Sequence, residues 1–299
     1  MQDNLTTFYK LTKKIKDDKF SIDLIPRYDL SLQVSTSLFR LCIVDTEENR
    51  CLIVEDYQLQ GITDTSQLIK VLNEIYEDHH LLKAGFWKTI RLGIKNLNFS
   101  LVPHSLFDHE YLTDYLTINC KKDVLSKDHV YYYKQNSSDA VNIFSANKQI
   151  VKYFTEAYPL KKLHIVHHTS SLIEGILQGT KGDEKSEMFI LVENNYITLL
   201  VRNQKKLEFC NCFNFTSTQD FVYFVMFVFE QLNLDPEKTK VFLYGEITPD
   251  SAIYIKLNSY ICNLRFGSRP ENLSFSYHFD ELFDHRFFDL YNMHLCEQP

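Results

Sequence analysis

Glycine is scarce in this chain, with eight in 299 residues and none before Gly61. Loops that hold nucleotide phosphates depend on glycine, because a Cβ atom blocks the close approach of backbone N–H groups to phosphate oxygens. The sequence contains no G-x-x-x-x-G-K-[ST] loop, no G-x-G-x-x-G loop and no G-x-S-x-G turn around a serine nucleophile. These absences argue against a P-loop NTPase, a dinucleotide-binding enzyme and a serine hydrolase of that type.

Long apolar runs, a secretory signal and a cysteine framework are also missing. The most apolar run, Phe221–Phe229, is far shorter than the roughly 20 residues that a membrane-spanning helix needs. The first ten residues are polar, without the apolar core of a signal peptide. Seven scattered cysteines are typical of reduced thiols. We therefore expect a cytoplasmic protein.

A basic surface is not indicated either. The chain has 39 acidic and 32 basic residues and a net charge of -7, which argues against a nucleic-acid backbone as main partner. The lysines at positions 13, 14 and 16 are followed at once by Asp17 and Asp18, so this stretch predicts a solvated face.

The first third of the chain predicts strands and one helix. Hydrophobic residues make up 44% of the chain, enough for a large core, and they alternate along three successive segments. An apolar helical stripe follows, with Asp64–Ser66 as candidate N-caps. We expect two further strands to pair with each other. In order, these segments are Tyr28–Val34, Leu38–Asp45, Cys51–Gln58, the stripe Leu68–Ile75, Thr89–Ile94 and Asn98–Val102.

The middle of the chain alternates helices with strands, which is typical of α/β architecture. The expected elements are a helix at Leu106–Leu116, a strand at Val141–Ser145, a helix from the cap Asn147 to Tyr158, a strand at Leu163–His167 and a helix at Ser170–Leu177.

The opening order of elements then recurs after Gly179–Ser186, a linker without large apolar residues. Three strands, a helix, a strand, a helix and a strand occur a second time, so the sequence predicts an internal duplication of structure. The second set is Glu187–Val192, Tyr196–Arg202, Lys205–Phe213, Ser217–Leu232, Val241–Tyr244, Pro249–Tyr260 and Cys262–Phe266.

Four segments carry a family resemblance: Phe99–Phe107, Asn214–Tyr223, Leu243–Ile247 and Phe287–Cys296. They resemble domain-of-unknown-function family 3822, an uncharacterised bacterial family. The doubled order of elements resembles the actin-like ATPase superfamily, which includes actin, Hsp70, sugar kinases, FtsA and the pilus protein PilM. The resemblance implies an α/β, ribonuclease H-like fold of two duplicated lobes, with mixed sheets each opened by an antiparallel three-strand meander.

The same resemblance implies domain boundaries. Residues 1–182 would form the first lobe, with a small subdomain inserted at about 103–158 as in PilM-like proteins. Residues 183–299 would form the second lobe, and the segment 280–299 would pack back on the body.

The loops that an actin-type ATPase uses have lost their pattern here. Such an enzyme holds phosphate with two hairpin turns, usually Asp-x-Gly, and adenosine with a Gly-Gly element. Asp-x-Gly occurs nowhere in this chain, the second turn keeps one carboxylate, and one glycine remains at the adenosine position. Asn195 is also a residue type that tolerates a left-handed conformation. The degenerate positions are Ser35, Thr36, Ser37, Glu193, Asn194, Asn195 and Gly245.

These losses predict a pseudo-ATPase with no catalytic residue, cofactor or metal, acting as a scaffold for a protein partner. The analogy is with FtsA and PilM, which recruit partners at the cytoplasmic face of the membrane. Two alternatives stay open. One is a divergent ATP-dependent phosphotransferase in which Glu193 organises the metal. The other is a ribosome- or nucleic-acid-associated accessory protein.

Two clusters have metal-ligating residue types. Cys210 and Cys212 together with His164, His167 and His168 suggest a zinc site, but C-x-C without a second pair is a weak signal, and buried thiols are the simpler interpretation. The second cluster is either a metal site or the polar face of a terminal helix that packs Leu282, Phe283 and Phe287 inward. It comprises Asp280, Glu281, Asp284 and His285.

Two aromatic segments also have two interpretations. The helix around Phe221–Phe229 is either a central helix covered on both sides or one that docks a partner with one face. Tyr131–Tyr133 is either a strand with mixed faces or a stacking platform for single-stranded nucleic acid. Few basic residues surround it, which favours the strand.

Overall fold

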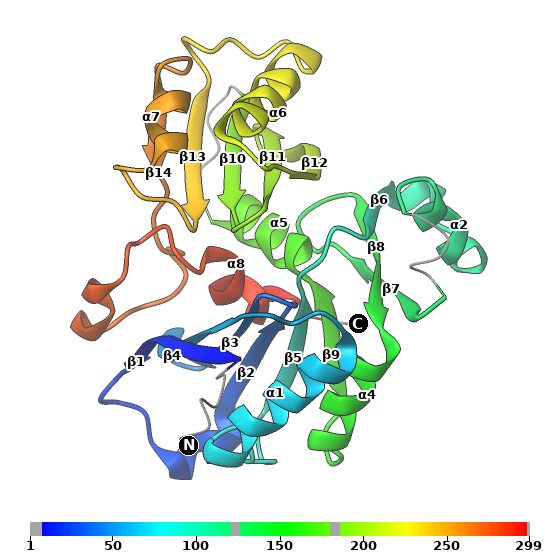
Figure 1. Ribbon diagram of the computed structural model, residues 1–299, viewed down its shortest axis with the longest axis vertical. Helices are drawn as coiled ribbons and strands as arrows, with labels where there is room; N and C mark the ends of the chain where they lie inside the picture. The colour runs from blue at the N-terminus through cyan, green and yellow to red at the C-terminus, as the bar shows by residue number, and fades with distance from the viewer. Residues whose placement is uncertain (1–7, 121–125, 180–185, 298–299) are drawn as a thin grey trace, which may run out of the picture.

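The computed structural model describes residues 8–120, 126–179 and 186–297 (Figure 1). Its strands form sheets of six, five and three strands. The six-stranded and five-stranded sheets are the centres of two lobes, and the three-stranded sheet lies beside them. The division of the chain into domains at residue 182 stays a prediction.

The six-stranded sheet has the order β1-β4-β3-β2-β5-β9. β1 to β4 pair antiparallel, and β5 and β9 continue from β2 in parallel, so the sheet is mixed. β2 and β3 are buried at every position. The strands are β1 (Tyr9–Lys16), β2 (Tyr28–Val34), β3 (Leu38–Asp45), β4 (Arg50–Leu59), β5 (Thr89–Ile94) and β9 (Leu163–His167).

Two helices with matching N-caps cover this sheet beside each other (Figure 1). α1 (Thr65–Asp78) begins at Asp64, whose carboxylate accepts the N–H of Gln67 at 2.9 Å. α4 (Lys148–Ala157) begins at Asn147, whose side chain accepts two N–H groups of the first turn. Both caps were expected from the sequence and are confirmed.

The three-stranded sheet corrects one expected pairing. It has the order β6-β8-β7, with β6 (Phe99–Pro103), β7 (Asp128–Lys134) and β8 (Ala140–Asn147), so β6 does not pair with β5. The chain leaves the six-stranded sheet at Asn96, whose side chain accepts the N–H of Asn98 and donates to the carbonyl of Ser145 in β8. Tyr131–Tyr133 lies in β7, as the strand interpretation expected.

The expected helix at Leu106–Leu116 is shorter than predicted. Two 3₁₀ turns, His104–Leu106 and His109–Tyr111, precede the short helix α2 (Leu112–Thr117). The Asp108 side chain accepts the N–H of Glu110, which closes the second turn before α2 starts.

The five-stranded sheet has the order β12-β11-β10-β13-β14 and repeats the plan of the first. Three antiparallel strands are followed by two that pair in parallel, so the mixed, duplicated fold class is confirmed. Its strands are β10 (Ser186–Val192), β11 (Tyr196–Asn203), β12 (Lys206–Asn214), β13 (Lys240–Gly245) and β14 (Leu264–Phe266).

Helices α6 (Thr218–Gln231) and α7 (Ala252–Asn258) pack against one face of this sheet (Figure 1). Ser217 and Asp220 form a capping box at the start of α6. The helix is not covered on both sides, because Tyr223 is 62% and Phe227 is 40% exposed. The central-helix interpretation is therefore wrong, and one aromatic face of α6 is open to solvent.

Helix α5 (His168–Gln178) lies between the lobes and is buried over His168–Leu177. It starts two residues before the expected Ser170, because the ring of His167 accepts the N–H of Thr169 and serves as the N-cap. Among the described residues, no helix is long and apolar enough to cross a bilayer.

Up to residue 297, the C-terminal segment contains short elements and no long amphipathic helix. A 3₁₀ turn (Tyr277–Glu281) is followed by α8 (Phe288–Tyr291) and a second 3₁₀ turn (Asn292–Leu295). Phe287 has a left-handed φ of 61° and separates the first turn from α8. Phe287 is 1% exposed within the core of the first lobe, whereas Phe283 is 54% exposed, contrary to the expectation that both pack inward.

Candidate functional site

A cleft of about 690 Å³ lies where the lobes face each other, and both degenerate turns line it. Ser35–Ser37 comes from the β2–β3 turn, and Asn194 and Asn195 come from the β10–β11 turn. Among the described residues that line the cleft, Lys95 and Asp128 carry charge. The neutral polar residues of its wall are Ser35, Thr36, Ser37, Thr65, Asn96, Asn98, Asn147, Asn194, Asn195 and Asn214.

The first turn uses its own hydroxyl group to close itself. Ser35 Oγ accepts the backbone N–H groups of Ser37 at 3.1 Å and Leu38 at 3.2 Å, and it lies 3.1 Å from Ser37 Oγ. In a phosphate-binding turn, such N–H groups point at the ligand. Here two of them already have an acceptor within the turn.

The second turn places its carboxylate in the interior. Glu193 is 4% exposed, and its Oε1 lies 2.5 Å from Lys95 Nζ and 3.8 Å from Arg40 Nη1. Asn195 does not take the left-handed conformation considered from the sequence, because its φ is not positive. Neither hairpin turn therefore has the backbone geometry that a glycine would give it.

Gly245 has a structural requirement of its own. Its φ is +86°, and a Cβ atom there would lie 2.2 Å from the carbonyl oxygen of Val192. The backbone approaches closely because the N–H of Glu246 donates to that same carbonyl at 2.8 Å. The contact between β13 and β10 thus explains the single glycine at the predicted adenosine position.

Seven charged side chains connect the two lobes behind the cleft, and we call them the interlobe network. Lys95 Nζ bridges Glu193 at 2.5 Å and Asp289 at 2.7 Å. Arg40 contacts Asp56 at 2.7 Å and Glu246 at 2.5 Å. The members are Arg40, Asp56, Lys95, Glu193, Glu246, Arg286 and Asp289.

The charged forms of this network support one another. Burial lowers the pKa of Lys95, but the carboxylates of Asp289 and Glu193 outweigh it, so the pKa is raised above its ordinary value. Burial likewise raises the pKa of Asp289, but the Lys95 ammonium outweighs it and holds the pKa at about 2. Removing either partner would leave the other charge buried without compensation.

Sequence reasoning found Glu193 but missed its partners. Arg40 interrupts the apolar stretch Leu38–Val44 of β3, and Lys95 directly follows the apolar end of β5, Leu92–Ile94. A charge embedded in a continuous apolar run is a usable signal, because a buried charge needs an opposite partner. The sequence does not reveal which acidic residue, about 100 or 200 positions away, pairs with each of these buried cations.

Of the cysteines and histidines that suggested a zinc site, Cys212 and His168 lie near each other. Cys212 Sγ lies 3.9 Å from His168 Nε2 and 3.1 Å from Thr198 Oγ1. Within the described part of the chain, no three His, Cys, Asp or Glu side chains are grouped so that they could hold a metal ion. Burial raises the pKa of Cys212 to about 12, so its thiol stays protonated at neutral pH.

The acidic tail cluster is dispersed among different partners. Asp280 and Asp284 lie 3.4 Å and 3.1 Å from Arg269. His285 is buried and donates from Nε2 to the carbonyl of Ile247 at 2.8 Å. These residues do not form the polar face of one helix, because the segment is not helical across positions 282–287. Nor are three of them grouped as a metal site in the described part of the chain.

His167 and His168 should make the protein sensitive to acid. Burial lowers the pKa of His168 from 6.5 to about 3 and that of His167 well below 6.5. Below pH 6.5 the unfolded chain takes up protons that the folded chain does not, so stability falls with pH until about pH 3. Urea unfolding at pH 7.5 and 5.0 should show a loss of about 2 kcal/mol from His168 alone.

His168→Gln should reduce that difference, whereas the same substitution at His104, an exposed residue, serves as the control. An unchanged pH dependence in the His168→Gln protein would contradict the assignment.

The duplicated mixed sheets around a central cleft define the actin-like ATPase fold, and solved structures agree. A Bacteroides thetaiotaomicron protein with an actin-like ATPase fold and unknown function is similar at 20% identity and a TM-score of 0.75, over 93% of this chain and 99% of that one. PilM, from the PilM–PilN type IV pilus biogenesis complex, is similar at 12% identity and a TM-score of 0.57, over 89% of this chain and 97% of that one. The ethanolamine utilization protein EutJ from Carboxydothermus hydrogenoformans is similar at 7% identity and a TM-score of 0.53, over 95% of this chain and 93% of that one.

At these identities the similarity establishes the fold alone. The family model described as protein of unknown function DUF3822 matches residues 17–264, and the chain belongs to this family. The resemblance drawn from the sequence is thereby confirmed. Among curated proteins no match was found.

Proposed function

We propose that this chain is a pseudo-ATPase of actin-like fold that serves as a scaffold for a protein partner. The observation that carries the proposal is the engagement of Glu193, the one carboxylate retained in the hairpin turns. Lys95 and Arg40 of the same chain surround it, and it is buried. An ATP-bound magnesium ion needs oxygen ligands that are free to face it.

The other carboxylates of the interlobe network are engaged in the same way. Asp289 accepts from Lys95 and, at 2.8 Å, from the amide of Gln33. Asp56 and Glu246 contact Arg40 and Arg286. A phosphotransferase that used Glu193 to organise a metal would first have to break a buried ion pair, which argues against that alternative.

The cleft wall supports the same conclusion. Triphosphate carries several negative charges, and its binding sites supply cations and converging N–H groups. The wall here offers hydroxyl and amide groups, and its lysine is already paired with two carboxylates. PilM is found in a complex with PilN. By analogy of fold, we propose binding of a protein as the activity of this chain.

Titration calorimetry with millimolar Mg-ATP should show no binding heat, and thermal unfolding should show no stabilisation. A ligand at 100 times its dissociation constant would add about 2.7 kcal/mol to stability, which raises the melting temperature by several degrees. Magnesium alone and ATP with chelator are the controls. Saturable binding of Mg-ATP below the millimolar range would overturn the pseudo-ATPase assignment.

A further inference from the structure

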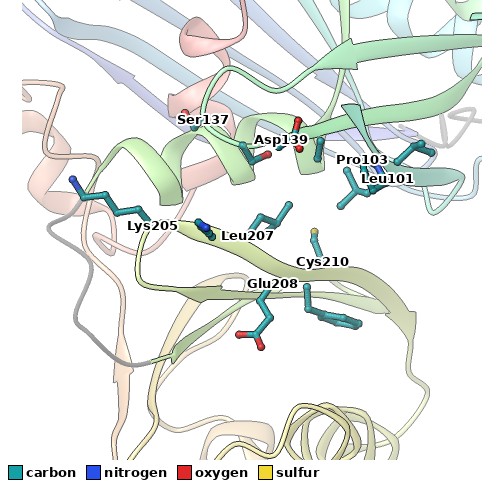
Figure 2. A pocket seen from close by; sticks show the side chains of 13 residues that line it. Leu101, Pro103, Ser137, Asp139, Lys205, Leu207, Glu208 and Cys210 are labelled. Carbon is teal, nitrogen blue, oxygen red and sulfur yellow. The ribbon is translucent and has the colours of Figure 1, made fainter. Parts of the chain in front are cut away.

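A second hollow, of about 650 Å³, lies between the edges of two sheets (Figure 2). One wall is β12 with the turn before it, and the other is β6 with the β7–β8 turn. Both β6 and β12 are outer strands of their sheets. The hollow is separate from the interlobe cleft and shares none of its lining residues.

We call this hollow the groove. The edge of β12 that faces the groove has backbone groups that are not paired with another strand. Cys212 donates its N–H to the side chain of Asn211 at 2.8 Å, so its N–H points away from β11. Because backbone groups alternate sides along a strand, the N–H and C=O of Cys210 point the same way. Among the described residues, no other element binds these groups of Cys210.

The floor of the groove is apolar. Leu101 of β6 and Leu207 and Cys210 of β12 are half-buried there and pack against the same core cluster. A bulge in β12 opposite Val201 and Arg202 places Leu207 on the face of Cys210, while Glu208 points to the opposite face (Figure 2). The groove therefore combines hydrogen-bonding edge groups with an apolar floor.

The walls of the groove come from different parts of the fold and carry charge at one end. Pro103 and the turn Ser137–Ala140 stand across from β12. Lys205 and Lys206, at the start of β12, are exposed and have no carboxylate within ion-pair distance among the described residues. Asp139 lies on the opposite wall (Figure 2).

We propose that a partner protein adds one extended segment to the free edge of β12 in this groove. The segment pairs with the backbone of Cys210, places alternate apolar side chains on Leu101 and Leu207, and carries an acidic residue beside Lys205 and Lys206. Main-chain hydrogen bonds give such strand addition its affinity, and the pockets for alternate side chains give it specificity. This inference rests on the proposed role as a protein scaffold and specifies the partner's binding segment.

The test begins with a library of random 12-residue peptides displayed on phage and selected on the full chain. Selected peptides should share alternating apolar residues with an acid at one end. Their affinities are then measured by fluorescence polarisation on variants of the groove. Cys210→Pro removes one outward N–H without breaking the ladder to β11 and should weaken binding about tenfold. Cys210→Ala keeps that N–H and should change affinity less than threefold.

A charge variant and an exchange measurement complete the design. Lys205→Glu with Lys206→Glu should weaken binding about tenfold, whereas Lys152→Glu on the exposed face of α4 should not. Hydrogen exchange at Cys210 should slow when peptide is added to the wild-type protein, which keeps the test valid if Cys210→Pro is unstable.

Three results would overturn the proposal. They are no enriched peptides, peptides that bind all groove variants equally, and a concentration-dependent dimer that protects β12 instead. Mg-ATP binding is measured in a separate experiment. A failure of the pseudo-ATPase proposal can therefore be distinguished from a failure of the peptide-binding proposal.

Discussion

Replacing Lys95 with methionine is expected to lower the free energy of unfolding by about 3–5 kcal/mol, because it leaves the carboxylates of Glu193 and Asp289 buried without their cation. In a chain of 299 residues this corresponds to a fall in melting temperature of about 5–8 °C. Urea unfolding at pH 7 measures the change directly.

Two further variants test the cause of that loss. Neutralising both acids as well, with Glu193→Gln and Asp289→Asn, should restore most of the stability, because no uncompensated charge then remains. Lys152→Met breaks the exposed pair with Glu156 and should cost less than about 0.5 kcal/mol. A Lys95→Met protein as stable as wild type would mean that water, not the lysine, compensates these acids.

Deletion of residues 280–299 is expected to give insoluble or molten protein. The segment contributes Phe287, Leu290, Tyr291 and Met293 to the core of the first lobe, each at most 1% exposed. Each fully buried side chain of this size contributes roughly 1.5–3 kcal/mol, and a whole domain has a margin of about 5–15 kcal/mol. Solubility, near-ultraviolet circular dichroism and dye binding measure the outcome.

A matched pair of point variants separates packing from chain length. Phe287→Ala should cost about 3–5 kcal/mol, since its ring lies under the guanidinium groups of Arg40 and Arg286 at 5.1 Å and 5.0 Å. Phe283→Ala should be nearly neutral, because that ring is 54% exposed. A soluble truncated protein with an unchanged melting temperature would show that the tail does not stabilise the body.

The fold was predictable where the local signal and the tertiary contacts agree. In β2, β3 and β10 the apolar runs and tight turns, and in α1 and α4 the N-caps, gave element types and positions that the structure confirms. β1 was missed because its lysines read as a solvated face. It is an edge strand that pairs with β4 alone, so four of its residues stay exposed.

The sequence was less informative where contacts are long-range. The partner of β6 is β8, about 40 residues later, and no local pattern distinguishes it from β5 next to it. The tail looks like an amphipathic helix by spacing, but the left-handed residue Phe287 interrupts it. At the cleft, the sequence alone showed that the turns lack glycine. It did not show which cations contact Glu193.

The interlobe network also has a consequence for the order in which the chain is made. Asp289, which holds Lys95, lies 194 positions after it in the chain. While the chain is being synthesised, the first lobe can form its sheet, but Lys95 has no acid from the tail to contact. A segment made long after the first lobe's strands therefore supplies both the charge that fixes the lobes together and the aromatic residues that complete the first lobe's core. Until that segment arrives, the first lobe exposes an unfinished apolar surface, the state in which nascent chains aggregate most readily.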